Sequence, residues 1–94
     1  MAASIQVEQL AEGEFHVRVI EGTSESQHTI TLSAKDYDRL TGGAVDRREL
    51  IKKSFEFLLE HEPKESILSR FDLLVIGRYF PQYEREIKRR LAKS

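Results

Sequence analysis

Cationic and aromatic side chains gather near the C-terminus, and together these residue types are suited to binding phosphate and stacking on bases. Tyr79, Phe80 and Tyr83 lie among the basic residues of this region. One of two interpretations is a surface for phosphate such as that of a nucleic acid, for an acidic partner or for a membrane, whose contact residues are Arg78, Arg85, Lys88, Arg89 and Arg90. In the alternative interpretation the aromatic rings pack in the core and the cations are solvated, with Glu84 and Glu86 pairing some of them.

The histidines and carboxylates do not form a pattern that performs catalysis or binds metal. His16 and His28 lie on strands that we expect to pair, but two histidines alone make a poor metal site. Gly42 and Gly43 are not followed by the Lys-Ser/Thr pair of a phosphate-binding loop. The chain has no cysteine, which excludes disulfides and thiolate metal sites. We therefore expect no catalytic residue, no metal ion and no cofactor, and a chain that is not an enzyme.

Length and charge narrow the function classes. Ninety-four residues fit a single domain, residues 1–94. The net charge of −1 argues against nucleic-acid binding by bulk attraction. The charge is unevenly distributed: residues 1–34 are acidic, with one Arg and five Glu, and residues 63–94 are basic, with eight basic and four acidic side chains. No secretory signal is recognisable, and the longest apolar run, residues 73–76, is too short to span a bilayer. We expect a cytoplasmic protein without membrane contact.

The first third of the chain alternates apolar and polar residues with a period of two, which is typical of strands with one buried face. The alternation covers Ile5 to Val7, Phe15 to Val19 and Ile30 to Leu32. Turns are expected at residues 11–13 and 21–26. Residues 1–33 thus predict a three-stranded antiparallel meander, whose apolar face needs helices from residues 34–94 to cover it. The fold class is α+β.

The helical half begins where the period changes. Ser33 is a candidate N-cap for a short helix through Leu40, which ends at the paired glycines. Asp46 opens a central helix over 46–61 that packs on the sheet. Further on, we predict a short helix containing residues 67–71, a second one capped by Asp72, and a last one starting near Pro81. The expected order is β-β-β-α-α followed by two or three more helices.

A family resemblance covers residues 27–60, which contain a strand HTITLS, a helix AKDYDRL, a glycine turn and a helix DRRELIKKSFEFLLE. In this order the stretch partly resembles the ribbon-helix-helix proteins, which are dimeric DNA-binding repressors and antitoxins. The resemblance implies that Gln27, Thr29 and Thr31 face the major groove and that the second helix contacts a phosphate near Asp46. The chain differs from the family in carrying that carboxylate and in having a strand around residues 15–20. Residues 63–91 look like sequence from short uncharacterised bacterial proteins.

Apolar residues of the helical half exceed what one small sheet is expected to cover. We therefore predict an exposed contact surface for a protein partner or a second copy of the chain, formed by Phe57, Leu73, Leu74 and Tyr79. The leading interpretation is a small non-catalytic interaction or regulatory module that binds a protein partner or itself. The alternative is a nucleic-acid-binding protein, a transcriptional regulator or antitoxin, that uses the third strand or the basic C-terminal helix.

Overall fold

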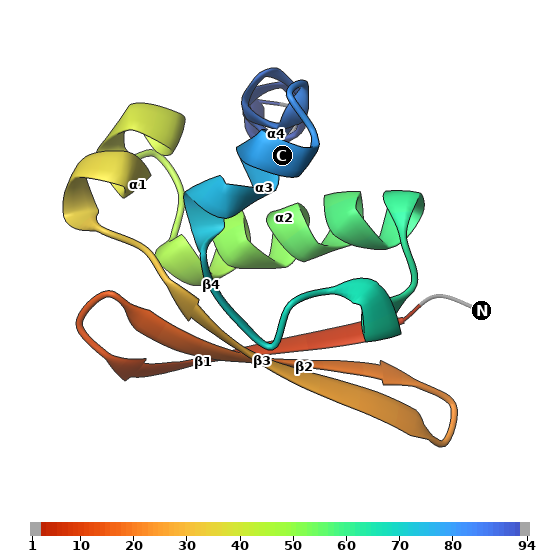
Figure 1. Ribbon diagram of the computed structural model, residues 1–94. Coiled ribbons are helices and arrows are strands. Elements are labelled where there is room, and N and C mark those ends of the chain that lie inside the picture. Colours follow the sequence, from red (N-terminus) through yellow and green to blue (C-terminus); the bar gives the residue numbers. More distant parts are fainter. Residues whose placement is uncertain (1–2, 93–94) are drawn as a thin grey trace.

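A computed structural model describes residues 3–92 and consists of a sheet with helices stacked on one of its faces (Figure 1). The strand order is β1-β2-β3-β4. The first three strands form an antiparallel meander, and the fourth runs parallel to β3. The strands are β1 (Ser4–Ala11), β2 (Glu14–Glu21), β3 (Ser24–Thr31) and β4 (Arg70–Asp72).

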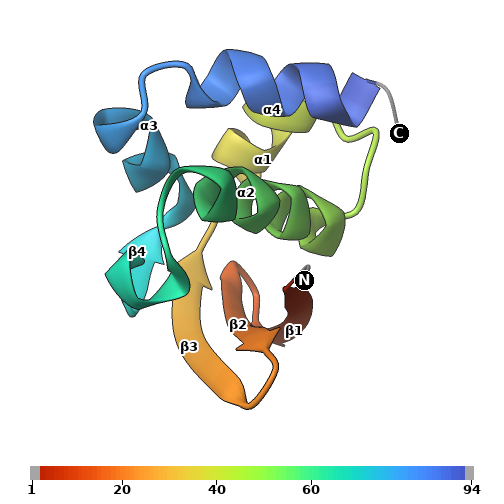
Figure 2. The same ribbon diagram turned by 90° about the vertical axis from the view of Figure 1, so that its right-hand side faces the viewer.

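The helices form two further layers above the sheet. Helix α2 lies directly on the sheet, and α1, α3 and α4 lie on the other side of α2 (Figures 1 and 2). The opposite face of the sheet carries no other element among the described residues. The bounds are α1 (Ala34–Thr41), α2 (Arg47–His61), α3 (Ile76–Tyr79) and α4 (Tyr83–Ala92), with short 3-10 turns η1 (Lys64–Ser66) and η2 (Leu73–Val75).

The α+β class, the meander and the two predicted helix starts are confirmed. The Ser33 hydroxyl accepts a hydrogen bond from the Asp36 amide, and the Asp46 carboxylate accepts one from the Arg48 amide. Each cap satisfies an amide that has no partner within its own helix. Gly42 ends α1 with a φ of 65°, a left-handed conformation that glycine adopts without steric cost.

The predicted short helix over residues 67–71 is wrong. A 3-10 turn covers Lys64–Ser66, and the chain then extends into β4. The Thr29 amide donates to the Ser69 carbonyl oxygen, and Phe71 lies beside Ile30 in the parallel register. The outer edge of β3 offers unpaired backbone groups, and pairing them outweighs the local helical spacing of the apolar residues. Asp72 does cap the next turn, since its carboxylate accepts from the Leu74 amide.

Helix α2 has apolar contacts on two sides. Phe55 faces the sheet side, where its ring lies 5.3 Å from that of His28 and 6.2 Å from that of Phe71, measured between centroids. Phe57 faces the outer helices, with its ring 5.6 Å from that of Tyr83 and 5.8 Å from that of Phe80. The apolar stripe of α2 is therefore wide because two layers pack on it.

A buried pair of hydroxyl groups joins α2 to α4. The Ser54 hydroxyl donates to the Leu50 carbonyl oxygen at 2.8 Å, so it accepts the hydrogen bond of the Tyr83 hydroxyl at 2.7 Å. Both side chains have an exposed fraction of 0%. Burial raises the pKa of the Tyr83 phenol, which therefore stays neutral and acts as the donor.

Replacing Ser54 by Ala should destabilise the fold by about 1–3 kcal/mol, because the Tyr83 hydroxyl loses its partner in a dry environment. The double variant Ser54→Ala/Tyr83→Phe removes both polar groups and should be more stable than the sum of the two single effects by about 1 kcal/mol. Urea unfolding of the four proteins measures this coupling. Strictly additive effects would show that the two hydroxyls do not depend on each other.

Candidate partner-binding pocket

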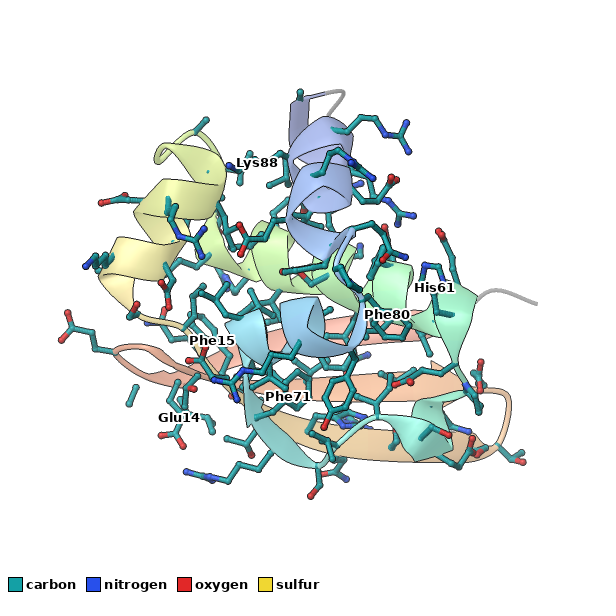
Figure 3. All side chains as sticks on the ribbon, turned by 45° about the horizontal axis from the view of Figure 1, so that its top comes forward. Glu14, Phe15, His61, Phe71, Phe80 and Lys88 are labelled. Atoms are coloured by element: carbon teal, nitrogen blue, oxygen red, sulfur yellow. The ribbon has the colours of Figure 1, made fainter. Side chains whose placement is uncertain are left out.

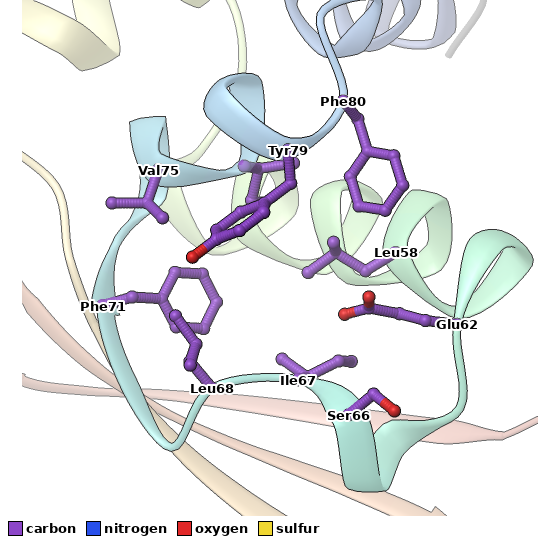
Figure 4. Close-up of a pocket in the computed structure, with 10 residues that line it drawn as sticks. Leu58, Glu62, Ser66, Ile67, Leu68, Phe71, Val75, Tyr79 and Phe80 are labelled. Carbon is purple, nitrogen blue, oxygen red and sulfur yellow. The ribbon is translucent and has the colours of Figure 1, made fainter.

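An apolar pocket of about 170 Å³ opens at the C-terminal end of α2. Its walls come from all three layers of the fold (Figure 4). Leu58 belongs to α2, Ile67 and Phe71 belong to the segment that leads into and forms β4, and Ile76 and Phe80 belong to the α3 region. The pocket therefore forms where the sheet and the outer helices separate beyond the end of the central helix.

Two large apolar side chains line this pocket and extend its apolar surface outward. Leu68 is 48% exposed and Tyr79 is 67% exposed. Among the described large hydrophobic residues, Leu10 on β1 is the other one with such exposure, at 53%. Two of the three exposed apolar side chains thus lie at one place, on segments separated in the sequence.

Glu62 brings a charge into this apolar pocket. Its side chain points from the end of α2 into the cavity, near Leu58 (Figure 4). Its carboxylate forms no hydrogen bond and no ion pair with the described residues. Lys64, two positions further along the chain, forms ion pairs with two other carboxylates. Its ammonium group lies 3.3 Å from the Glu21 carboxylate and 2.5 Å from that of Glu65. The pocket therefore presents an uncompensated negative charge.

A buried histidine forms a hydrogen bond to the backbone of Leu68, a residue that lines the pocket. His28 is 3% exposed, and its Nδ1 lies 2.7 Å from the Leu68 carbonyl oxygen. Because a carbonyl oxygen only accepts, Nδ1 carries the proton, and in the neutral ring Nε2 accepts from the Ser26 hydroxyl at 2.8 Å. Burial lowers the pKa of His28, and the hydrogen bond to Leu68 opposes part of that shift.

The predicted partner residues are split between the core and the surface. Tyr79 lines the pocket, and Leu74 is partly buried against the core. Phe57 and Leu73 are 1% and 0% exposed, which removes them from any contact surface of this fold. Phe57 is buried because the second helical layer covers the side of α2 that faces away from the sheet.

The residues implied by the ribbon-helix-helix resemblance lie on the uncovered face of the sheet. Gln27 donates to Glu25 and lies 3.0 Å from the Nε2 of His16, and the Thr31 hydroxyl donates to Asp72 at 2.9 Å. Thr29 lies between them on the same face. The Gln27 and Thr31 side chains are hydrogen-bonded to their neighbours, and β3 is paired by β2 on one edge and by β4 at Thr29–Thr31 on the other.

This sheet face has an acidic balance. Its described charged residues are Glu8, Glu14, Arg18, Glu25, Arg70 and Asp72, a formal charge of −2. Arg18 is held by the Glu25 carboxylate at 3.0 Å, which lowers the pKa of Glu25, and Arg70 lies 3.3 Å from Glu14. The cations of the face are thus already paired with carboxylates, which disfavours phosphate binding.

The basic residues of the C-terminal region divide into paired and unpaired ones. Arg90 lies 2.6 Å from the Glu60 carboxylate and 3.0 Å from that of Glu86, which also pairs with Arg89. Arg78, Arg85 and Lys88 are exposed and form no hydrogen bond or ion pair with the described residues. Glu84 pairs with Arg39 of α1 at 2.7 Å. Lys88 extends beside α1 at the top of the molecule (Figure 3).

The histidines lie apart. His16 lies on the uncovered face of the sheet and His28 on the face covered by α2. His16 pairs with Thr29, the neighbour of His28 on β3, and adjacent strand residues point to opposite faces. His61 stacks on Phe80 with ring centroids 5.0 Å apart, at the far end of α2 (Figure 3). Within residues 3–92 no cluster of three or more potential ligands is arranged to hold a metal ion.

None of the described helices has the length and apolar character needed to cross a membrane.

Comparisons of the chain with protein-family models, with curated proteins and with solved structures found no significant match. The pocket therefore has to be interpreted from its own residues. Tyr79, a predicted partner residue, lines this pocket. Glu62 and Leu68 also line it but were not predicted as site residues, because Leu68 was placed on a helix and the sequence around Glu62 carries no recognisable motif.

The buried, neutral His28 predicts that stability depends on pH. Its pKa is lowered in the folded state, so below the ordinary histidine pKa of roughly 6.5 the unfolded chain binds more protons and the fold loses stability as the pH falls. His28→Gln should flatten the curve between neutral and mildly acidic pH in urea unfolding. Val17→Ala, opposite His28 on β2, should lower stability without changing the slope. Equal slopes in wild type and His28→Gln would contradict this assignment.

Proposed function

We propose that this chain is a small non-catalytic interaction module that binds a protein partner through the pocket at the end of α2. The observation that carries this proposal is the joint exposure of Leu68 and Tyr79, at 48% and 67%, beside an apolar cavity. Apolar side chains grouped around a concavity are typical of protein contact sites, since their burial on binding is favourable. The partner is another protein or a second copy of this chain.

The lining of the pocket supports a role in binding rather than catalysis. It offers Glu62, Ser66 and the Tyr79 hydroxyl as polar groups, and the remaining lining residues are apolar. No nucleophile in it lies within hydrogen-bonding distance of a general base among the described residues, which is the arrangement that nucleophilic catalysis requires. Binding through shape and apolar burial needs no such arrangement.

A second candidate function is nucleic-acid binding through α4 and its surroundings. Arg85 and Lys88 favour it because they are exposed and form no ion pair with the described residues. These two cations supply a weak, salt-sensitive phosphate contact, and Lys88 also interacts electrostatically with Glu84. The acidic sheet face with Gln27, Thr29 and Thr31 contributes less to phosphate binding, because Glu25 and Glu14 form ion pairs with its two arginines.

A photo-crosslinking amino acid at position 79 should capture the partner in the source cell, because Tyr79 protrudes at the pocket. The same amino acid at Leu10, which is similarly exposed on β1, is the matched control and should not capture it. The captured protein is then purified and titrated. Leu68→Ser/Tyr79→Ser should weaken its binding by about tenfold or more, and Leu10→Ser should leave it unchanged.

A captured species of twice the chain's mass would identify a second copy as the partner, and sedimentation of the purified protein would then show the dimer. Identical crosslinks from positions 79 and 10 would contradict the proposal. So would an affinity that is unaffected by the double variant.

The nucleic-acid alternative is tested by titrating mixed duplex DNA at several salt concentrations. If α4 binds phosphate, affinity should fall steeply with salt, and Arg85→Glu should weaken binding more than Lys52→Glu does. Lys52 is the matched control because it is an exposed cation on another helix and undergoes the same charge reversal. Absence of binding at low salt, or equal effects of the two variants, would eliminate this function.

A further inference from the structure

The chemistry of the pocket points to a partner of a particular kind. We infer that the pocket receives a lysine or arginine side chain, flanked by apolar residues, from a peptide segment of the partner, with its charged group at Glu62. This inference rests on the proposed function and specifies which partner chemistry the pocket selects. The carboxylate, the aromatic walls, the end of α2 and the pocket size support it.

The Glu62 carboxylate is the first reason. It points into an apolar pocket and forms no hydrogen bond or ion pair with the described residues (Figure 4). A charge beside apolar walls loses part of its hydration and gains from an opposite charge more than it would in open solvent. Lys64, the nearest cation in the sequence, is bound by Glu21 and Glu65 and leaves Glu62 uncompensated.

The backbone of α2 adds to this negative potential. Glu62 is the C-cap of a fifteen-residue helix, where the helix dipole places a partial negative charge. A glutamate at this end is unfavourable by itself because it adds like charge. A cation bound at Glu62 interacts favourably with both the carboxylate and the helix end.

The aromatic rings of Phe71, Tyr79 and Phe80 line the same pocket. Aromatic faces attract ammonium and guanidinium groups and also pack well against alkyl chains. Lysine and arginine carry both parts, a charged head on an apolar stem. An acidic side chain would be repelled by Glu62, and a purely apolar one would leave the carboxylate desolvated without a partner.

The size of the pocket favours a side chain of a larger partner over a free metabolite. Its volume of about 170 Å³ lies below the roughly 300–1,000 Å³ of sites that enclose drug-sized molecules. The exposed surfaces of Leu68 and Tyr79 then remain available for apolar residues on either side of the inserted cation. A peptide segment provides both the inserted cationic side chain and the flanking apolar residues.

The test uses the ¹⁵N-labelled full chain and two blocked tripeptides, acetyl-Leu-Lys-Leu-amide and acetyl-Leu-norleucine-Leu-amide. Norleucine keeps the stem of lysine and lacks its ammonium group. NMR titration should show saturable shifts of the amides of residues 62, 66–68, 79 and 80. The lysine peptide should bind about five-fold more tightly than the norleucine peptide, as expected for one partly exposed ion pair.

Glu62→Gln should remove this preference while leaving the spectrum of the folded protein intact. Glu56→Gln removes the same charge from α2 at a position outside the pocket and should preserve the preference. Equal binding of the two peptides by wild type would overturn the charge selectivity and leave the proposed apolar contact standing.

Two other outcomes would overturn the inference. Shifts of the same amides by n-butylammonium, without binding of either peptide, would assign the pocket to a free amine. Binding of neither probe at millimolar concentration would show that the pocket does not select cations. The crosslinking experiment at position 79 decides the proposed function separately, because it does not depend on the chemistry of the inserted side chain.

Discussion

The arrangement of the whole molecule depends on α2 being buried from two sides. A helix that covers one face of a sheet needs one apolar stripe, but α2 turns Phe55 toward the sheet and Phe57 toward α3 and α4. The Ser54–Tyr83 hydrogen bond fixes the outer layer to it in a dry contact. Where α2 ends, the two layers are no longer held apart by a helix and the pocket opens between them.

Local sequence signals predicted much of this fold. The period of two and the glycine turns defined the meander, and Ser33 and Asp46 marked the helix starts, because strand alternation and capping depend on neighbouring residues. β4 was not predictable in this way, since its formation depends on the free edge of β3, distant in the sequence. The same limit applied to the pocket: the exposure of Leu68 and the burial of Phe57 are consequences of packing between layers.

Charge shows why composition is an incomplete guide to binding. The C-terminal third is basic, yet Glu60 and Glu86 pair with Arg90, and Glu84 pairs with Arg39 of a different helix. Lys64, Arg70 and Arg90 of this region pair with carboxylates of other elements, so part of its positive charge joins elements of the fold. Glu62 is the reverse case: it directly precedes the basic region, yet its carboxylate forms no ion pair with the described residues. Its isolation becomes visible once the partners of the surrounding charges are known.

The fourth strand also affects the order in which the molecule forms. The hydrogen bond between Thr31 and Asp72 spans 41 positions, whereas the meander closes through nearby residues. Contacts of large sequence separation close late, and a three-residue strand at a sheet edge is among the first parts to open in native-state fluctuations. During synthesis the sheet and α2 emerge before the residues that complete the pocket. A ligand that fills the pocket contacts Phe71 of β4, so ligand binding disfavours the local opening of this strand.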